Sequence, residues 1–411
     1  MQSDTERISR IVVALEQSGL DGVVCSLPTN VLLLSGYWPV VGTAMAVATR
    51  QGQIALVVPV DELPLAQRGW AGEIHVFEPG SLHIMRRAID AARPPLADVL
   101  GGLGLTHGRI GIESGPGFEP ASYAAMHFYG ISLRDLLWDL APLATTVPAD
   151  SLLAELRSCP TKVELGRIRV ACAIAGRAYL IGAQLIAAGE SEGGIAAGFR
   201  RPLHDRGESD EVARGDGYAF CMSGPNSAQA HGSYARSRSR RVEAGDFLLV
   251  HCNSCADGYW TDITRTYCLG EPSDTQLRMY QAVLAARDAA FEAIAPGVLA
   301  SEVDLAARNE IDRRGFGAEF KHPTGHGVGF AAIDHNAMPR LHPRSDDRLD
   351  RGMVFNVEPA IYIERVGGVR HCDMVAVTDQ GMELLTPFHS TLADLTLDPS
   401  LLPAPSGAAH E

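Results

Sequence analysis

Four short stretches of the sequence together supply histidine, cysteine and carboxylate side chains, and three of the stretches contain glycine. The first stretch, 245–266, contains His251 and Asp262. The other three read Thr-Gly-His326-Gly-Val-Gly, Asn-Val-Glu358-Pro and Gly-Gly-Val-Arg-His-Cys372-Asp. Imidazole, thiolate and carboxylate groups ligate metal ions and transfer protons in enzymes. These residues are therefore the first candidates for chemistry.

In this order the four stretches resemble the C-terminal half of the pita-bread family, which includes methionine aminopeptidase, proline aminopeptidase, prolidase and creatinase. Its metal-dependent members use five ligands, in chain order Asp, Asp, His, Glu and Glu. The resemblance places His251, Asp262, His326, Glu358 and Cys372 at these positions. The first Asp is therefore replaced by His, and the last Glu by Cys.

These two replacements change the ion that the resemblance implies. They remove two carboxylates that could share oxygens between two ions, and a thiolate prefers softer metals than Mn²⁺ or Mg²⁺. Imidazole and thiolate both suit Zn²⁺. We expect a remodelled site with one divalent metal, zinc or iron in preference to manganese. A metal-free site is the alternative, because creatinase also departs from the acidic ligands.

The last ligand position has two neighbouring candidates. Creatinase carries His in place of the last Glu, and His371 directly precedes Cys372. Adjacent strand residues face opposite sides of a sheet, so only one of the two can fill the position. Counting back from Asp373 favours Cys372.

A hairpin must bring the first two candidates together. His251 lies on an expected strand, 247–253, and Asp262 follows the turn at 256–258. Pairing of the two flanking strands would place both side chains next to each other.

A second hairpin and a glycine-rich loop must position the other three ligand candidates. We expect Glu358 and Cys372 to face each other across a hairpin whose turn contains Gly367 and Gly368. His326 is bracketed by glycines, which allow the backbone to approach a ligand closely.

Two further histidines are candidates for acid–base chemistry. The phrase that runs from Ser223 to His231 resembles one in the family, whose His contacts substrate in the peptidases and acts as acid and base in creatinase. His322 matches a His of the proline peptidases, although a structural hydrogen bond explains it equally well. Neutral imidazole titrates near pH ~6.5, so either residue could transfer protons.

Arg370 and His335 are the candidates for substrate binding. Arg370 matches an Arg that positions substrate in proline-specific members, and guanidinium can hold a carboxylate with two hydrogen bonds. An ion pair with Asp373 or Glu358 is the alternative for Arg370. His335 comes slightly later than the family's His-Glu pair and is followed by Asn instead of Glu.

The periodicity of the chain predicts two domains. Helix and strand signals alternate up to about residue 145, which indicates an α/β N-terminal domain. Its phrase from Asn30 to Tyr37 resembles the N-terminal domain of creatinase and prolidase. Mainly strands follow from 217, as in an α+β pita-bread catalytic domain. We place these creatinase-like and catalytic domains at 1–150 and 151–397, and expect a disordered tail at 398–411.

Composition excludes several classes of protein. The net charge of −14 argues against nucleic acid and anionic membranes as partners. Eight cysteines in 411 residues are too few for a disulfide framework. The first ten residues lack a secretory pattern, and apolar runs such as 54–60 are too short to cross a bilayer. We expect a cytoplasmic protein, and the resemblance implies a homodimer.

Three functions remain open. The first is an Xaa-Pro-peptidase-like hydrolase that cleaves an amide or other C–N bond of a short peptide or small molecule. Metal-activated water would attack, and Glu358 would either accept its proton or only ligate the metal. His231 and His322 would stabilise the tetrahedral intermediate and protonate the leaving nitrogen. The second is a metal-free, creatinase-like hydrolase or lyase with His231 as general base. The third is a non-catalytic binding protein that has kept the pocket.

Overall fold

The computed structural model describes residues 4–40, 43–78, 87–114, 132–204, 212–231, 235–334 and 336–398. The chain divides into two compact units, Met1–Val163 and Glu164–Glu411. The domain boundary at 150 and the disorder of the tail remain predictions. His335 and all of the tail beyond Asp398 lie outside the described residues.

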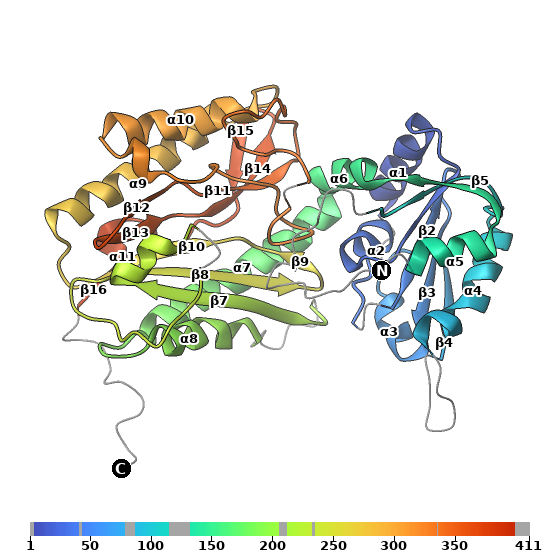
Figure 1. Ribbon diagram of the computed structural model, residues 1–411, viewed down its shortest axis with the longest axis horizontal. Helices are drawn as coiled ribbons and strands as arrows, with labels where there is room; N and C mark the ends of the chain where they lie inside the picture. Colours follow the sequence, from blue (N-terminus) through green and yellow to red (C-terminus); the bar gives the residue numbers. More distant parts are fainter. Residues whose placement is uncertain are drawn as a thin grey trace, which may run out of the picture. The chain divides into compact units, whose positions relative to one another are not determined.

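The first unit contains a six-stranded mixed sheet (Figure 1). Its strands are β1 (Gly22–Cys25), β2 (Met45–Thr49), β3 (Ile54–Pro59), β4 (Glu73–Phe77), β5 (His107–Ile112) and β6 (Leu143–Pro148). They lie in the order β4-β3-β2-β1-β5-β6, and β1 pairs antiparallel with β2 but parallel with β5. The helical segments are α1 (Thr5–Gln17), α2 (Pro28–Ser35), η1 (Val60–Glu62), α3 (Leu63–Ala66), α4 (Ala88–Gly102), α5 (Ser132–Leu140) and α6 (Asp150–Ser158). The predicted α/β class is confirmed.

Apolar packing holds this sheet together. Strands β1, β2 and β3 are buried along their whole length, as is typical of apolar strands covered on both faces. Leu96 and Leu100 from α4 and Leu137 from α5 pack into the same core as Val24 and Val57. Each buried side chain of this size contributes about 1.5–3 kcal/mol, so α4 and α5 fix the sheet.

The second unit begins with two helices and then alternates strands and helices. Its helical segments are α7 (Lys162–Gln184), α8 (Glu192–His204), η2 (Gly224–Gln229), α9 (Asp274–Ala293), α10 (Ala300–Arg313), η3 (Gly317–Glu319) and α11 (Leu392–Leu395). Its strands are β7 (Gly215–Ser223), β8 (Phe247–Ala256), β9 (Tyr259–Trp260), β10 (Thr264–Leu269), β11 (Val354–Val357), β12 (Ala360–Ile363), β13 (Gly367–Arg370), β14 (Asp373–Thr378), β15 (Gly381–Leu384) and β16 (Thr396–Leu397). Helix α8 packs on β7 and β8, whereas α9 packs against β11, β13 and β15 (Figure 1). This α+β unit agrees with the predicted pita-bread domain.

A hairpin carries the first two candidate residues, as the sequence predicts. Strand β8 pairs antiparallel with β9 and β10, and His251 stands opposite Thr264. The turn consists of Asp257 and Gly258, both with positive φ, which matches the right-handed twist of the strands. Asp262 therefore lies on the same face as Thr264, diagonally across from His251.

The second hairpin differs from its prediction in the position of its turn. Gly367 and Gly368 are not in the turn but in β13, where Gly367 pairs with Ile363. The turn is 364–366, and Arg365 supplies its left-handed residue with φ 68°. A side chain at Gly368 would overlap the carbonyl of Ser227 in η2, so glycine serves close packing here.

Candidate functional site

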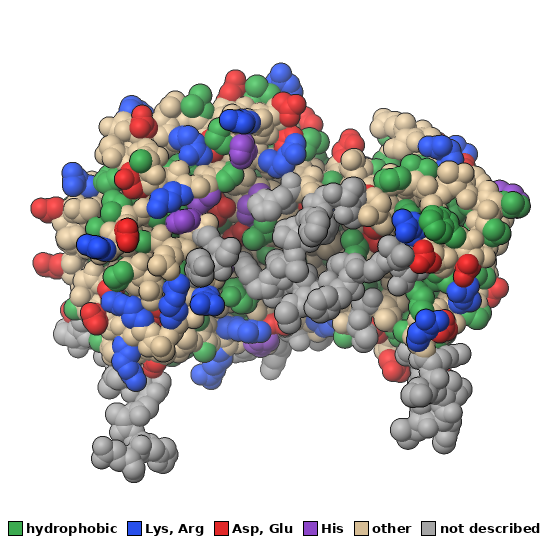
Figure 2. All heavy atoms as spheres, viewed as in Figure 1, with side chains coloured by type: hydrophobic (Ala, Val, Ile, Leu, Met, Phe, Trp, Pro, Cys, Tyr) green, Lys and Arg blue, Asp and Glu red, His purple; other side chains and the backbone are tan. Residues whose placement is uncertain are grey.

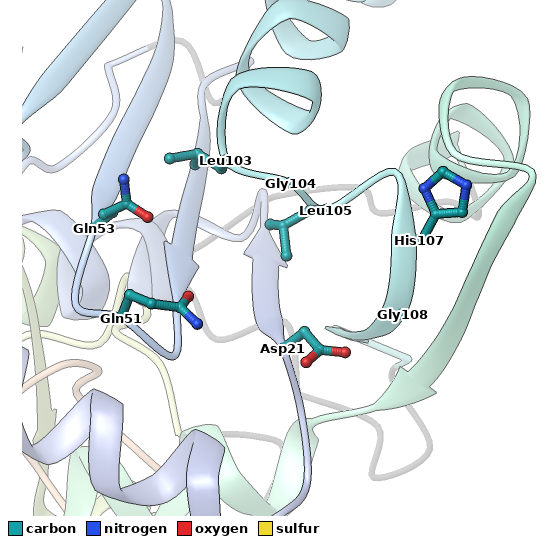
Figure 3. A pocket seen from close by; sticks show the side chains of 8 residues that line it. All are labelled: Asp21, Gln51, Gln53, Leu103, Gly104, Leu105, His107 and Gly108. Atoms are coloured by element: carbon teal, nitrogen blue, oxygen red, sulfur yellow. The ribbon is translucent and has the colours of Figure 1, made fainter.

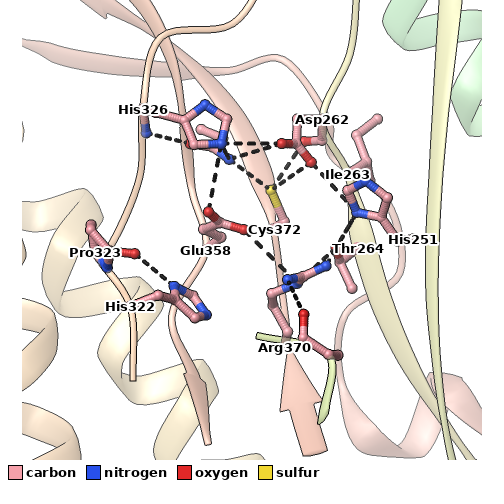
Figure 4. Close-up of polar contacts among 12 residues, drawn as sticks. His251, Asp262, Ile263, Thr264, His322, Pro323, His326, Glu358, Arg370 and Cys372 are labelled. Carbon is pink, nitrogen blue, oxygen red and sulfur yellow. Dashed lines mark hydrogen bonds and ion pairs between the residues drawn. The ribbon is translucent and has the colours of Figure 1, made fainter. Parts of the chain in front are cut away.

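All five predicted ligand positions converge in the second unit (Figure 4). His326 Nε2 lies 3.3 Å from Asp262 Oδ2 and 3.7 Å from Glu358 Oε1. Cys372 Sγ lies 3.7 Å from Asp262 Oδ1, and His251 Nδ1 lies 3.6 Å from the same oxygen. Both replaced residues thus point toward the three that match the family.

Strand alternation explains why Glu358 and Cys372 meet. Val357 pairs with Asp373 and Ala360 pairs with Arg370, so Glu358 stands opposite Cys372 in one continuous register. Neighbouring residues face the other way.

On that other side, His371 Nε2 lies 2.8 Å from Tyr280 Oη, and Asp373 forms a 2.5 Å ion pair with Arg265. His371 is therefore directed into the packing against α9 and not into the site.

The two carboxyl groups of the site differ in pKa. Burial alone would raise the pKa of Asp262, but His251 and His326 lower it to about 2. Burial raises the pKa of Glu358 to about 7, against the opposing effect of Arg370. A carboxyl group with a pKa near neutrality can both accept and release a proton.

His251 is held on all sides by its neighbours. Its Nδ1 lies 3.0 Å from Thr264 Oγ1, and its Nε2 lies 3.0 Å from Asn253 Nδ2. The ring stacks on Phe220, with centroids 4.8 Å apart. Burial lowers the pKa of His251 to about 4, so the imidazole is neutral at physiological pH.

Arg370 places a permanent cation inside the site. The Arg370 side chain is 9% exposed. Nε donates to Thr264 Oγ1 at 3.1 Å and lies 3.9 Å from Glu358 Oε2, and Nη2 lies 3.3 Å from His251 Nδ1. The ion pair with Glu358 was one alternative for Arg370; Asp373 is paired with Arg265 instead.

His231 and His322 meet at Tyr362, a residue that the sequence analysis missed. His322 Nε2 lies 3.0 Å from Tyr362 Oη, and the ring of His231 lies 5.1 Å from the Tyr362 ring. His231 is exposed, whereas Tyr362 is buried. Burial lowers the pKa of His322 to about 4. The sequence did contain a signal for Tyr362, because residues 358, 360 and 362 of an extended segment lie on the same face.

Asn356 is the second residue that sequence reasoning missed. Its Nδ2 donates to Asp262 Oδ2 at 3.3 Å and to Cys372 Sγ at 3.4 Å, and lies 3.2 Å from His326 Nε2. It precedes Glu358 by two positions, so strand alternation places both on one face.

Comparison with known proteins identifies the family. Residues 166–379 match the model of metallopeptidase family M24, and residues 7–159 match the creatinase/prolidase N-terminal domain. The chain belongs to metallopeptidase family M24.

Relatives of this M24 chain cover nearly all of it. An Xaa-Pro dipeptidase from Pyrococcus furiosus is 29% identical over 382 residues, which are 93% of this chain and 97% of the relative. The prolidase structure from Pyrococcus horikoshii superimposes with a TM-score of 0.74 at 27% identity, covering 94% of this chain and 100% of that one. An Xaa-Pro dipeptidase structure from Bacillus anthracis gives 0.77 at 25% identity, covering 95% and 99%. The chain is thus similar to peptidases over both units and is an M24-family peptidase hydrolase.

The donor set of this M24 member does not fit a metal ion in its present arrangement. Across the described ranges, no group of three or more His, Cys, Asp and Glu side chains is arranged to hold one. The amide nitrogen of Asn356 and the guanidinium of Arg370 stand among the five positions. The five-residue metal site predicted from the family therefore remains a prediction.

A pocket in the first unit offers no comparable chemistry (Figure 3). It has a volume of about 370 Å³ and is lined by Asp21, Gln51, Gln53, Leu103, Gly104, Leu105, His107 and Gly108. Its carboxylate is already engaged, because Asp21 pairs with Arg50 at 2.8 Å and accepts from the Arg109 backbone at 2.8 Å. The candidate site is therefore the one in the second unit.

The outer surface and the helices give no indication of a nucleic-acid or membrane partner in the described part of the chain. On the face drawn in Figure 2, described basic and acidic side chains are interspersed. None of the helices in the described part of the chain has both the length and the apolar character needed to span a membrane.

Proposed function

We propose that this chain hydrolyses an amide or related C–N bond in a short peptide or small molecule that carries a carboxylate. One observation carries the proposal. The carboxylate of Glu358 lies between His326 at 3.7 Å and Arg370 at 3.9 Å, in a site that also contains Tyr362, His322 and the more exposed His231.

Glu358 serves as the general base. Its side chain is 12% exposed, so it can reach a substrate while it is shielded from bulk solvent. A water oxygen attacks the carbonyl carbon, and its proton passes to Glu358. Positioned bases of this kind contribute about 10²–10⁴-fold to rate.

Arg370 and the histidines complete the reaction. The guanidinium donates hydrogen bonds to the substrate carboxylate or to the oxygen that becomes negative in the tetrahedral intermediate. The C–N bond then breaks, and the leaving nitrogen takes a proton from His231 or from protonated Glu358. His322 and Tyr362 orient the substrate through their mutual hydrogen bond.

The charge of the site supports an acidic substrate. Exposed Lys321 and His231 lie close enough to influence each other, and Arg370 adds a buried cation. The relatives named Xaa-Pro dipeptidase support a dipeptide, whose C-terminal carboxylate would suit these cations. His335 remains a predicted contact of the substrate.

Two broader predictions belong to the same proposal. We infer a cytoplasmic location from the sequence pattern and a homodimer from the family resemblance, and light scattering of the purified protein would give the oligomeric state. The metal-activated form of the reaction would use the same Glu358, so metal content distinguishes the two forms.

Activity of matched variants tests the proposed function. Wild-type protein would be incubated with a panel of dipeptides, including Xaa-Pro dipeptides, and with small acyl amides, and products separated by chromatography. We expect Glu358→Gln to lower kcat about 10³-fold. Glu364→Gln makes the same change at an exposed position of the neighbouring turn and should leave kcat unchanged. Hydrolysis that survives in Glu358→Gln, or no hydrolysis of any panel member, would overturn the proposal.

A further inference from the structure

The orientation of the Asn356 amide is fixed by the backbone. Its Oδ1 accepts a hydrogen bond from the backbone N–H of His326 at 2.7 Å. Rotating the amide by half a turn would place its NH₂ group against that donor, so Oδ1 must face His326 N.

The opposite end of the same amide therefore presents hydrogens to the site. Nδ2 donates to Asp262 and to Cys372, and lies 3.2 Å from His326 Nε2. Three of the five predicted ligand atoms thus face one NH₂ group. A cation held by those three atoms would meet the positive end of the amide dipole, which opposes binding.

A second asparagine acts on His251 in the same way. Asn253 Oδ1 accepts from the backbone N–H of Ile263 at 2.7 Å, which directs Nδ2 toward His251 Nε2 at 3.0 Å. A neutral imidazole has one nitrogen lone pair. Both ring nitrogens face a donor, since Nε2 lies 3.0 Å from Asn253 Nδ2 and Nδ1 lies 3.3 Å from Arg370 Nη2, so the lone pair is engaged within the chain at either nitrogen.

Arg370 supplies the charge that an ion would otherwise bring. Its guanidinium stays protonated in proteins and lies among His251, Thr264 and Glu358. Two buried carboxylates without a cation would cost several kcal/mol. The positive charge of Arg370 offsets this cost in place of a bound metal ion.

We propose that the amides of Asn356 and Asn253, together with the Arg370 guanidinium, occupy the ligand atoms of the inherited metal centre, so that this M24 member holds no ion there. This inference goes beyond the proposed function, since it concerns what balances the site and not which bond is cleaved. It also assigns a positioning role to two asparagines that the family's ligand pattern does not include.

Metal stoichiometry tests the inference without any activity assay. Wild-type protein would be dialysed separately against Zn²⁺, Fe²⁺ and Mn²⁺, passed through a desalting column, and analysed for bound metal by mass spectrometry. We expect well below about 0.1 ion per chain for each metal. Asn356→Asp keeps the size of the side chain but directs an oxygen lone pair at Asp262, Cys372 and His326. It should gain about one ion per chain, with zinc bound most tightly.

Asn309→Asp is the matched control, because it makes the same change at an exposed position of α10 and should bind no ion. Stoichiometric metal in the wild type would overturn the inference, whether or not the variants fold. A folded Asn356→Asp that binds no more metal than Asn309→Asp would overturn the role given to the amide. Neither result depends on whether the protein cleaves amides, so failure here and failure of the proposed function are distinguishable.

Discussion

The two units each contain a partly buried glutamate whose surroundings differ. In the first unit, Glu113 accepts hydrogen bonds from the backbone N–H groups of Ser26 and Leu27, from Ser26 Oγ and from Asn30 Nδ2, all between 2.9 and 3.2 Å. In the second unit, Glu358 has His326 at 3.7 Å and Arg370 at 3.9 Å. Burial raises the pKa of both carboxyl groups.

The difference separates a structural carboxylate from the one that we propose as general base. Four donors at short distance fix Glu113 at the start of α2 and leave little room for another partner. Glu358 also interacts with Asn356, but His326 and Arg370 lie beyond hydrogen-bonding distance from its carboxylate, so a substrate or water can approach it. Burial alone does not distinguish the two roles, whereas the distance of the partners does.

Removal of the cation beside Glu358 should have the largest effect on stability. Arg370→Met leaves Asp262 and Glu358 without the guanidinium and should lower the free energy of unfolding by about 3 kcal/mol. Urea denaturation at neutral pH measures the change. Arg351→Met removes an exposed partner of Asp379 and should cost less than about 1 kcal/mol. Equal losses in the two variants would contradict the account of a charge-balanced site.

A conservative change of the structural glutamate should have the next largest effect. Glu113→Gln replaces one acceptor oxygen with an NH₂ group that faces donors, which should lower the free energy of unfolding by about 2 kcal/mol. Thermal denaturation at several urea concentrations measures the loss. Full stability of this variant would show that its four donors are not what holds the carboxylate.

The pH dependence of stability should report on His322. Its pKa falls from 6.5 to about 4 in the folded protein, so the unfolded chain binds the proton more tightly. Stability contributed by the neutral imidazole is therefore present at pH 7 and is lost as pH falls from about 6.5 toward 4. His322→Gln should reduce the loss of unfolding free energy between pH 7.5 and 5 by about 1 kcal/mol. An unchanged pH profile would mean that His322 is accessible to solvent protons.

The smallest effect should come from removing one donor to Glu113. Ser26→Ala deletes the hydroxyl at 3.2 Å but keeps the backbone N–H groups, and should cost about 0.5–1 kcal/mol. Chemical denaturation can resolve this difference against the wild type. A cost as large as that of Glu113→Gln would mean that the hydroxyl alone holds the carboxylate.

The sequence predicted the gathering of the site because the family's residues recur in order. His251, Asp262, His326, Glu358 and Cys372 were expected to meet, and strand pairing brings them together. The amides were not predictable from the ligand pattern, since Asn253 and Asn356 lie between motif residues. Their role depends on which backbone N–H group donates a hydrogen bond to each side-chain amide oxygen, and this is set only by the folded structure.

The predicted turn of the second hairpin was wrong because glycine is used both in turns and where two backbones approach closely. Gly367 and Gly368 resembled a turn, but the left-handed residue is Arg365. The glycines instead let η2 lie against β13. Such close approach involves residues distant in the chain and leaves no local signal. By contrast, Gly36 ends α2 with a left-handed φ of 71°, which is a local requirement that glycine meets.

The most direct test of the comparison measures turnover and unfolding free energy in the same preparations of Glu358→Gln and Glu113→Gln. Glu358→Gln should lose about 10³-fold in kcat while its unfolding free energy stays within about 0.5 kcal/mol of the wild type. Glu113→Gln should lose stability and keep the kcat of its folded fraction. If both variants lose activity and stability together, or if Glu358→Gln turns over normally, the distinction between the two glutamates is contradicted.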